Sequence, residues 1–326
     1  MAKDLFERRI DYLRISVTDR CNLKCIYCTP AEGLHPFEKE EILTSGEIVR
    51  AVKIACRFGI RKVRITGGEP LLRSDIVQLI RSVKEVGIRD LSITTNGILH
   101  ASMANKLRNA GLDRINISLD TLRAERFSRI ARGGDLYSVW EGIARAEEAG
   151  LTPIKLNVVP LRGTNYDELI DFAKLTFEKD YHIRFIELMP GRSDNNWNRG
   201  AVVRKEEIMD CIAGLGDLLP LKSRGKGPSR NYKIKGARGV IGFISAISDH
   251  FCNSCNRLRL TAKGMLRPCL FSATEIDLKT SMREGASDEE LRSLFAKAVT
   301  AKPRGHSLNT ESGGLQDLPT MSRIGG

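Results

Sequence analysis

The sequence has no apolar stretch approaching the roughly 20 residues that a membrane-spanning helix needs. Five of its first nine residues are charged, where a secretory signal peptide would have an apolar segment. Both absences favour a cytoplasmic protein without a membrane partner. In that reducing compartment, closely spaced cysteines are more often metal ligands than disulfides.

Aromatic residues are also scarce, at 6% of 326 residues, and the basic residues form no continuous tract. The chain nevertheless carries a net charge of +12, from 52 Lys and Arg against 40 acidic residues. Such a charge attracts anions. Because the basic residues are dispersed and aromatics are few, we expect a phosphorylated small molecule as the anionic partner and no nucleic acid.

Three of the eight cysteines stand close together, with no fourth cysteine or histidine beside them. They are Cys21, Cys25 and Cys28, at C-x3-C-x2-C spacing directly after an expected strand. Iron-sulfur clusters are normally held by four thiolates, and structural zinc by four ligands in a closed tetrahedron. Three thiolates leave one iron of a cluster open for a reactive ligand, so the spacing favours an iron-sulfur site. Zinc with a distant fourth ligand and ordinary thiols are the alternatives.

From residue 12 to about 190, β-branched runs of strand length alternate with longer amphipathic segments, as in repeated βα units. A capping box at residues 44–47 begins one helix, and others begin near residues 74, 101, 136 and 167. About six parallel units fit either an open doubly wound sheet or an incomplete barrel, and the pattern leaves both open. The expected strands are 12–17, 63–66, 91–94, 114–118, 154–159 and 183–187.

Beyond residue 190 this periodicity breaks. We expect strands at 240–245 and 257–260 and a last helix at 288–298. Residues 192–200 and 222–239 are expected to be loops, the second basic and either mobile or wrapped across the surface. The predicted division is a region of residues 1–230 and a smaller region of residues 231–326.

Unusual residues follow the second expected strand, in the run Gly67-Gly68-Glu69-Pro70. Taken alone, this run is most simply a turn. Glycines also let a ligand approach the backbone closely, and Glu69 supplies a carboxylate for an ammonium group. In parallel α/β folds, ligands gather where strands end, and the three cysteines also follow a strand.

The three cysteines together with Gly-Gly-Glu-Pro resemble the radical S-adenosylmethionine superfamily. The resemblance implies an incomplete (β/α)6 barrel, which selects one of the two folds left open above. It also implies a 4Fe-4S cluster on Cys21, Cys25 and Cys28, whose fourth iron is chelated by the amine and carboxylate of S-adenosylmethionine. The implied cofactor contacts are Tyr27, Gly68, Glu69, Ser118 and Met189.

A second set of three cysteines, Cys252, Cys255 and Cys269, has C-x2-C-x13-C spacing. By spacing alone, zinc completed by the nearby His250 is at least as well supported as iron. Arg257 and Arg259 follow, two residues apart on an expected strand, so that both guanidiniums point the same way. Such a pair suits a phosphate or a nucleobase edge; a solvated edge strand is the alternative.

The second cysteine set, the arginine pair and the terminal Gly325-Gly326 together resemble the GTP 3',8-cyclase family of molybdenum cofactor biosynthesis. Ala246, where that family often has proline, is a small departure. The resemblance implies a second 4Fe-4S cluster whose open iron holds the guanine of GTP. It implies that Gly325 and Gly326 enter the active site and act there with Arg257 and Arg259. The implied GTP contacts are Arg14, Arg64, Thr95, Lys155, Arg184, Arg257 and Arg259.

The reaction implied by this resemblance converts GTP to (8S)-3',8-cyclo-7,8-dihydroguanosine 5'-triphosphate. A 5'-deoxyadenosyl radical takes hydrogen from C3' of the ribose, and the carbon radical attacks C8 of guanine. The implied partners are an electron donor such as flavodoxin or ferredoxin and the next enzyme, cyclic pyranopterin monophosphate synthase; a homodimer is compatible with the sequence. Two alternatives stay open: a radical S-adenosylmethionine enzyme acting on a peptide, and a zinc-containing nucleic-acid-binding protein.

Overall fold

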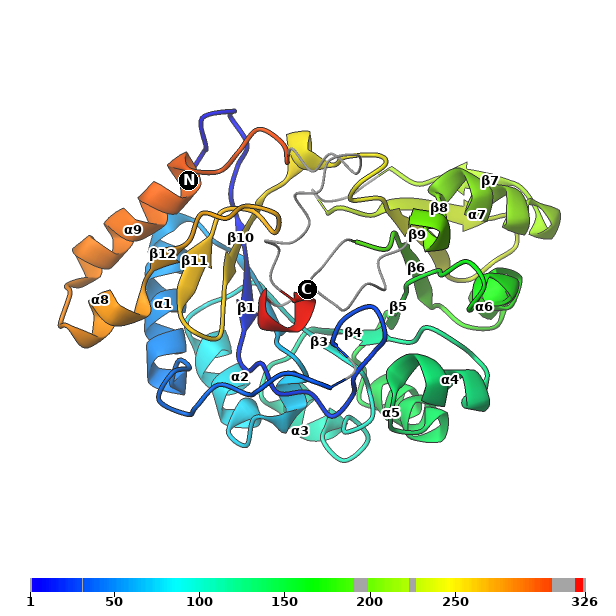
Figure 1. Cartoon of the computed structure of the whole chain (residues 1–326), viewed down its shortest axis with the longest axis horizontal. Helices are drawn as coiled ribbons and strands as arrows, with labels where there is room; N and C mark the ends of the chain where they lie inside the picture. The colour runs from blue at the N-terminus through cyan, green and yellow to red at the C-terminus, as the bar shows by residue number, and fades with distance from the viewer. Residues whose placement is uncertain (1, 31, 190–198, 223–226, 307–319, 325–326) are drawn as a thin grey trace.

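A single curved sheet organises the chain, as the computed structural model in Figure 1 shows; it describes residues 2–30, 32–189, 199–222, 227–306 and 320–324. The sheet has 12 strands in the order β12-β11-β10-β1-β2-β3-β4-β5-β6-β9-β8-β7. Neighbouring strands from β10 through β1 to β6 and on to β9 pair in parallel, and antiparallel strands extend both ends. Within the described residues the two ends do not pair, so the sheet is an incomplete barrel.

The strands are short, as is usual for a parallel barrel. They are β1 (Tyr12–Ser16), β2 (Lys62–Thr66), β3 (Asp90–Thr95), β4 (Arg114–Ser118), β5 (Lys155–Val158), β6 (His182–Ile186), β7 (Leu218–Pro220), β8 (Arg230–Ile234), β9 (Val240–Ile244), β10 (Arg257–Leu260), β11 (Met265–Arg267) and β12 (Ile276–Asp277).

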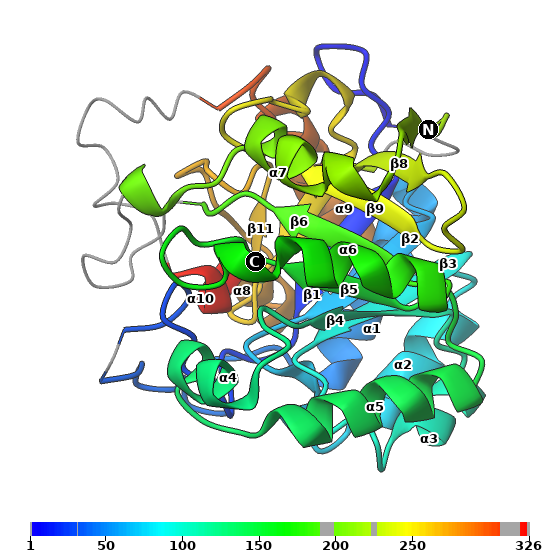
Figure 2. The same ribbon diagram turned by 90° about the vertical axis from the view of Figure 1, so that its right-hand side faces the viewer.

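The helices lie on the outside of the sheet, and Figure 2 shows α5 and α6 in that position. They are α1 (Ser45–Phe58), α2 (Ile76–Glu85), α3 (Ala104–Asn109), α4 (Ala124–Ala131), α5 (Leu136–Glu148), α6 (Leu169–Glu178), α7 (Lys205–Ile212), α8 (Lys279–Arg283), α9 (Asp288–Thr300) and α10 (Met321–Ile324).

Alternate residues of each strand face opposite ways and differ sharply in polarity. On β1, Leu13 and Ile15 are fully buried in the hydrophobic core, whereas Tyr12 and Arg14 line a central cavity. The same alternation holds on β2, β3, β5 and β6, whose apolar residues pack in the hydrophobic core. The barrel interior is therefore a polar chamber rather than a packed core.

The predicted elements agree closely with the observed ones. All six predicted strands of the first region are present, each within one residue at either end, and the capping box at Thr44 begins α1. The later strands at 240–245 and 257–260 and the helix at 288–298 are also confirmed, as β9, β10 and α9, although α10 follows as a further short helix.

One predicted loop is wrong. Within the basic segment 222–239, the structure has the strand β8, which pairs antiparallel with β9. The outer edge of β9 offers unpaired backbone groups, and Tyr232 of β8 packs edge-on against Phe243, with ring centroids 5.6 Å apart. This pairing outweighs the high charge of the segment. The other predicted loop is residues 192–200, of which 192–198 lie outside the described residues.

The last third of the chain extends both ends of the sheet. Strands β7, β8 and β9 continue it beyond β6, while β10, β11 and β12 continue it beyond β1. The final helix α10 lies toward the middle of the ring of strands in Figure 1. The division into residues 1–230 and 231–326 stays a prediction, but the two parts share this one sheet. Among the described residues, no helix is both long and apolar enough to cross a membrane.

Candidate active site

The central cavity has a volume of about 640 Å³ and is lined by both cysteine sets. Apart from Glu69, every predicted site residue that the structure describes lines it. Those residues are Cys21, Cys25, Cys28, Cys252, Cys255, Cys269, Tyr27, Gly68, Ser118, Met189, Arg14, Arg64, Thr95, Lys155, Arg184, Arg257 and Arg259. The fold thus brings together residues that are up to about 250 positions apart in the sequence.

The loop that carries the first three cysteines is fastened to the Gly-Gly-Glu-Pro run by backbone hydrogen bonds. The amide of Gly68 donates to the carbonyl of Thr18 at 2.8 Å, and that of Glu69 donates to the carbonyl of Arg20 at 2.7 Å. A Cβ on Gly68 would lie 2.3 Å from the Arg20 carbonyl oxygen. The glycine is therefore required by the chain's own backbone, whatever ligand also approaches it.

Glu69 is only 1% exposed and does not line the cavity. Its carboxylate accepts hydrogen bonds from the Thr95 hydroxyl at 2.7 Å and from the amides of Asn96 at 2.7 Å and Leu71 at 3.0 Å. Burial raises the pKa of Glu69 to about 7, although these hydrogen bonds oppose the shift. In this arrangement the carboxylate joins the ends of β2 and β3.

Asp120, just beyond β4, positions the ring that stands between the second and third cysteines. The hydroxyl of Tyr27 donates to Asp120 at 2.5 Å, and the amide of Val159 donates to its other oxygen at 2.8 Å. Burial raises the pKa of Asp120 to about 6. Ser118, the last residue of β4, and Met189, three residues after β6, also line the central cavity.

Cationic side chains form a layer across the cavity. Arg14 on β1 is in register with Arg259 on β10 and with Arg64 on β2. Burial, reinforced by neighbouring arginines, lowers the pKa of Arg259 to about 10 and that of Arg184 to about 9. The same causes lower the pKa of Lys155 to about 6. So many basic groups in one cavity would repel one another when charged, unless a polyanion is bound.

Three described residues that line this chamber also carry a buried polar atom without a protein partner. Within the described chain, Arg184 Nε, Asn157 Oδ1 and Thr94 Oγ1 are buried and make no hydrogen bond, and all three residues line the cavity. Buried polar atoms are rarely left unpaired. Together with the cations, they fit a ligand that carries both donors and acceptors.

The second cysteine set is held by cations from other parts of the chain. Arg8 donates to the carbonyl of Cys252 at 2.8 Å, and Lys302 donates to the carbonyls of Arg257 at 2.8 Å and Pro268 at 2.7 Å. Burial opposes ionisation of the Cys255 thiol, but Arg257 and Lys302 outweigh it and lower its pKa to about 7. This environment favours a thiolate ligand.

The spacing of the sulfur atoms bears on which metal fits the cysteines. A tetrahedral zinc ion bound at 2.3 Å brings its thiolates to roughly 3.8 Å from one another. Among the described residues, neither cysteine set is a group whose three ligand atoms all lie within 4.8 Å of one another. Neither set, as it lies in the structure, therefore has the compact spacing of a single tetrahedral zinc site. His250 lies close to Cys252, but the two do not form such a group with Cys255 and Cys269.

Several cavity residues were not predicted. The strand pattern could have identified them, because each stands two or four positions from a predicted site residue on the same strand, or at the same register on the neighbouring strand. Lys302, which follows α9, carries no comparable signal in the sequence. The strand residues are Tyr12, Lys62, Ser92, Arg114, Asn157 and His182.

The chain end approaches the cavity. Met321 of α10 lines it, and Ile324 is 4% exposed. Arg323 donates to the carbonyl of His35 at 3.1 Å and lies over the ring of Phe37, 4.7 Å from its centroid. The predicted residues Gly325 and Gly326 lie outside the described residues.

Comparisons with known proteins agree with this site. Residues 15–176 match the family model described as Radical SAM superfamily, and residues 181–308 match Molybdenum Cofactor Synthesis C. The protein named GTP 3',8-cyclase from Pelotomaculum thermopropionicum is 49% identical over 327 residues, covering 99% of this chain and 100% of the relative. The one of the same name from Heliobacterium modesticaldum is 53% identical over 330 residues, covering 99% of each.

Solved structures support the fold alone. SuiB of Streptococcus suis bound to S-adenosylmethionine has a TM-score of 0.56 at 17% identity, covering 82% of this chain and 61% of that chain. SuiB bound to its precursor peptide SuiA has a TM-score of 0.58 at 16% identity, covering 96% and 72%. On the near-full-length likeness to the curated relatives, the chain belongs to the GTP 3',8-cyclase family of the radical S-adenosylmethionine superfamily.

Proposed function

We propose that the protein converts GTP to (8S)-3',8-cyclo-7,8-dihydroguanosine 5'-triphosphate in molybdenum cofactor biosynthesis. The observation that carries this proposal is a single cavity lined by two sets of three cysteines and by a layer of buried cations. A zinc-containing nucleic-acid-binding protein fits these features less well, because the cations line an interior cavity of the barrel and the relatives are named as GTP cyclases.

Cys21, Cys25 and Cys28 would hold the first 4Fe-4S cluster, with S-adenosylmethionine beside it. When bound, the cluster and S-adenosylmethionine together supply the one-electron chemistry that generates a hydrogen-abstracting radical. The chain's own part is to fix positions: backbone bonds at Gly68 and Glu69 hold the cysteine loop, and Asp120 orients Tyr27. Gly68, Tyr27, Ser118 and Met189 are the proposed contacts of S-adenosylmethionine. Glu69 supports that contact surface from behind.

Cys252, Cys255 and Cys269 would hold the second 4Fe-4S cluster, next to the guanine. The triphosphate is assigned to the cationic layer, because Lys and Arg neutralise phosphate oxygens strongly in a partly dry cavity. Such binding fixes the ribose between the two cysteine sets, and positioning of this kind supplies much of an enzyme's rate acceleration. The proposed contacts are Arg14, Arg64, Thr95, Lys155, Arg184, Arg257 and Arg259.

The partners follow from this chemistry. The proposal requires a one-electron donor such as flavodoxin or ferredoxin and, downstream, cyclic pyranopterin monophosphate synthase. Oxygen-sensitive clusters and free thiols also favour the cytoplasm. The C-terminal residues Gly325 and Gly326 are proposed to extend from α10 into the cavity.

The direct test uses anaerobically reconstituted protein with GTP, S-adenosylmethionine and a strong reductant. We expect GTP to raise the formation of 5'-deoxyadenosine well above a slow background, together with the cyclised nucleotide detected by mass spectrometry. Formation of 5'-deoxyadenosine that does not depend on GTP, with no nucleotide product, would contradict the proposal. GTP replaced by ATP is the matched control, since only the base differs.

A second test separates the two cysteine sets. Wild-type protein should contain about eight iron atoms, and the Cys269→Ser variant about four. That variant should lose GTP cyclisation but retain slow reductive cleavage of S-adenosylmethionine, because the first set is intact. Unchanged cyclisation in Cys269→Ser would show that the second set is only structural. Cys56→Ser, on α1 and outside the cavity, is the matched control.

A further inference from the structure

The segment 302–306, shortly after α9, packs along the second cysteine set. Its first residue, Lys302, is only 3% exposed and lines the central cavity. A Cβ on Gly305 would lie 3.8 Å from Cys252 Cβ and 4.0 Å from the Cys252 sulfur, which is ordinary packing contact. A short stretch of chain thus lies against a site whose cysteines come from other loops.

One buried guanidinium ties the middle of this segment to Cys252. Arg8 donates to the carbonyls of Pro303 at 2.6 Å and Arg304 at 2.9 Å, and also to that of Cys252 at 2.8 Å. Its charge is balanced nearby, because Arg8 and Asp4 form an ion pair at 2.6 Å in which both side chains are almost fully buried. Arg8 therefore holds the backbone without adding net charge to the site.

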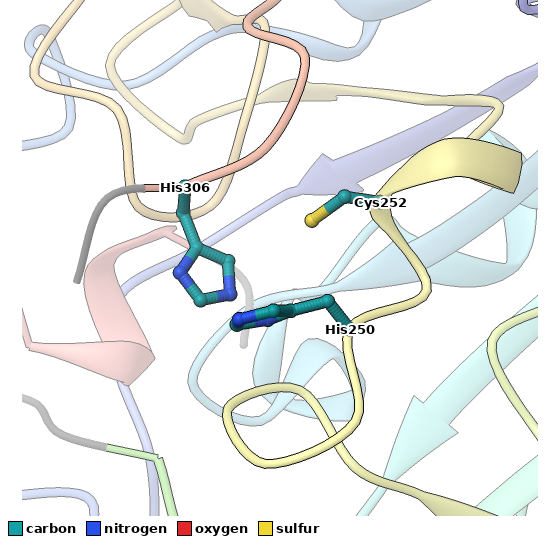
Figure 3. A group of neighbouring side chains, drawn as sticks. All are labelled: His250, Cys252 and His306. Carbon is teal, nitrogen blue, oxygen red and sulfur yellow. The ribbon is translucent and has the colours of Figure 1, made fainter. Parts of the chain in front are cut away.

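A histidine fixes the end of the segment. His306 Nε2 donates to the carbonyl of Ala246 at 2.7 Å, since a carbonyl oxygen only accepts hydrogen bonds. The ring of His306 meets those of His250 and Phe271 edge to face, with centroids 4.3 and 4.8 Å apart. Figure 3 shows both imidazoles beside Cys252. With both its middle and its end fastened, the segment has a defined path past the cysteines.

The ammonium of Lys302 joins the two loops that carry Cys255 and Cys269. It donates to the carbonyl of Arg257 at 2.8 Å and to that of Pro268 at 2.7 Å. Arg257 comes two residues after Cys255, and Pro268 directly precedes Cys269. The ammonium also makes a hydrogen bond to the sulfur of Cys255. A single side chain thus fixes the relative position of the two loops and touches one of the sulfurs.

The charge of Lys302 is balanced differently from that of Arg8. Burial lowers the pKa of Lys302, and the neighbouring groups that most favour its positive charge are the sulfurs of Cys255 and Cys269. A buried charge is costly unless it is paired. An iron-sulfur cluster on three thiolates is an anion, so a cluster bound to the second cysteine set supplies the counter-charge that this ammonium needs.

We propose that Lys302 is a positioning residue for the second 4Fe-4S cluster, which joins the loops of Cys255 and Cys269 and donates a charged hydrogen bond to the Cys255 sulfur. This inference deepens the proposed function and rests on it. Reduction adds negative charge to a cluster, so a cation beside it stabilises the reduced form more than the oxidised form. Lys302 therefore both retains the second cluster and raises its reduction potential.

The reduction potential distinguishes this role from a merely structural one. Full-length protein with the first cysteine set replaced by serine is reconstituted with iron and sulfide, and reduction is followed by electron paramagnetic resonance at controlled potentials. Lys302→Met should shift the potential to a more negative value, because the charge and the hydrogen bond are lost. Lys297→Met, which removes an exposed lysine of α9, is the control and should cause no shift. An unchanged or less negative potential in Lys302→Met would overturn the proposal.

Iron release measures the retaining role in the holoenzyme with both cysteine sets intact. A chelator should remove about four of about eight iron atoms at least tenfold faster from Lys302→Met than from wild type, and the other four at the wild-type rate. The double variant Asp4→Asn, Arg8→Met loosens Cys252 without changing the net charge, so it should release iron faster at an unchanged potential. An equal shift of potential in the double variant would refute the specific role of the ammonium.

The first cluster reports whether the variants fold. If Lys302→Met also loses the iron of the first set, Lys302→Gln is measured in its place, since it keeps two N–H donors without the charge, and the same negative shift is expected. Wild-type protein with only about four iron atoms would overturn both the proposed function and this inference. About eight iron atoms in wild type, with release rate and potential unchanged in the Lys302 variants, would refute this inference and leave the proposed function intact.

Discussion

At position 68 the packing of the chain itself requires a glycine, independently of any ligand. The carbonyls of Asp19 and Arg20 would lie 2.6 and 2.3 Å from a Cβ there, closer than real contacts allow. The backbone just before Cys21 therefore packs directly on the Gly-Gly-Glu-Pro run. This contact links the geometry of the first cysteine set to a run 40 residues later in the sequence.

Gly68→Ala should displace this backbone and destabilise the protein by about 1 to 3 kcal/mol, the usual cost of overpacking. We also expect less iron in the first cysteine set. Chemical denaturation and iron analysis measure both effects. Gly46→Ala is the matched control, because a Cβ there meets nothing within 4 Å. Equal stability of the two variants would show that the loop adapts freely.

Lys155 should make the affinity of the cavity for GTP depend on pH. Its pKa is lowered to about 6 by burial and by neighbouring arginines, so at pH 8 the amine is mostly neutral. A bound triphosphate is fully ionised at that pH and raises the pKa of the amine, so binding takes up one proton. Affinity for GTP should then fall up to tenfold per pH unit as pH rises between about 6 and the pKa in the complex.

Calorimetry in buffers of different ionisation enthalpy measures this uptake, with the reductant left out so that no turnover occurs. Lys155→Met should abolish the uptake and weaken binding. Lys155→Arg is the control, because arginine stays charged and should remove the uptake while keeping much of the affinity. Proton release on binding to wild-type protein would contradict the assignment.

Within the site, the sequence indicated which side chains gather there more clearly than it indicated what each of them contacts. The cysteines and arginines were predicted because thiol spacing and charge have few other uses in such patterns. The carboxylate of Glu69 was expected to meet a ligand, yet it accepts three hydrogen bonds from the protein. Lys302 was missed because its role depends on α9 returning to β10, a contact that no local pattern records.

Among the elements, the short helix α10 makes the most specific contact. Two cations lie over the ring of Phe37, with Arg323 4.7 Å and Lys263 4.2 Å from its centroid. Arg323 also donates to the carbonyl of His35. These contacts fasten the chain end at the mouth of the cavity.

Arg323→Met should loosen α10 by about 0.5 to 2 kcal/mol, the range for a cation over an aromatic ring. If the terminal glycines act inside the cavity, cyclisation should slow by a factor of roughly 2 to 30. Steady-state turnover and cleavage by carboxypeptidase measure the two effects, and iron content should be unchanged. Lys263→Met, which removes the other cation from the same ring, is the control. Normal turnover with rapid carboxypeptidase cleavage would exclude a role for the tail.

The sequence pattern predicted the strands best where one face of the strand packs against the covering helices. Strands β1 to β6 are rich in β-branched residues because one face packs under helices, so their positions were clear from sequence. Strand β8 was missed because only its pairing with β9 makes it a strand, and pairing partners are not visible in local composition. The choice between an open sheet and a barrel likewise depended on long-range pairing.

At the scale of the whole molecule, the sheet joins the two predicted regions at three places, one of them the pairing of β7 with β8. Strand β10 pairs with β1, and β9 pairs with β6. Cys252 and Cys255 stand in the connection between β9 and β10, which crosses from one end of the parallel strands to the other, and Cys269 follows β11. Both cofactor sites thereby face one chamber.

A fragment of residues 1–230 should therefore not fold as an independent unit. It lacks β9 and β10, so the edges of β1 and β6 are left unpaired, and such edges promote aggregation. Size-exclusion chromatography and urea denaturation compare the fragment with the full chain. A monomeric fragment with a cooperative unfolding transition would show that the first region is a self-sufficient domain.

The pairing of β1 with β10 cannot form until most of the chain has been synthesised. Tyr12 is in register with Arg257, so the first strand waits for one made about 245 residues later. At about 5–20 residues per second, the delay is roughly 12 to 50 s. Throughout that interval the cysteines after β1 are already outside the ribosome beside an open strand edge. Chaperones that cover this edge, or early delivery of iron and sulfide, would act within that window.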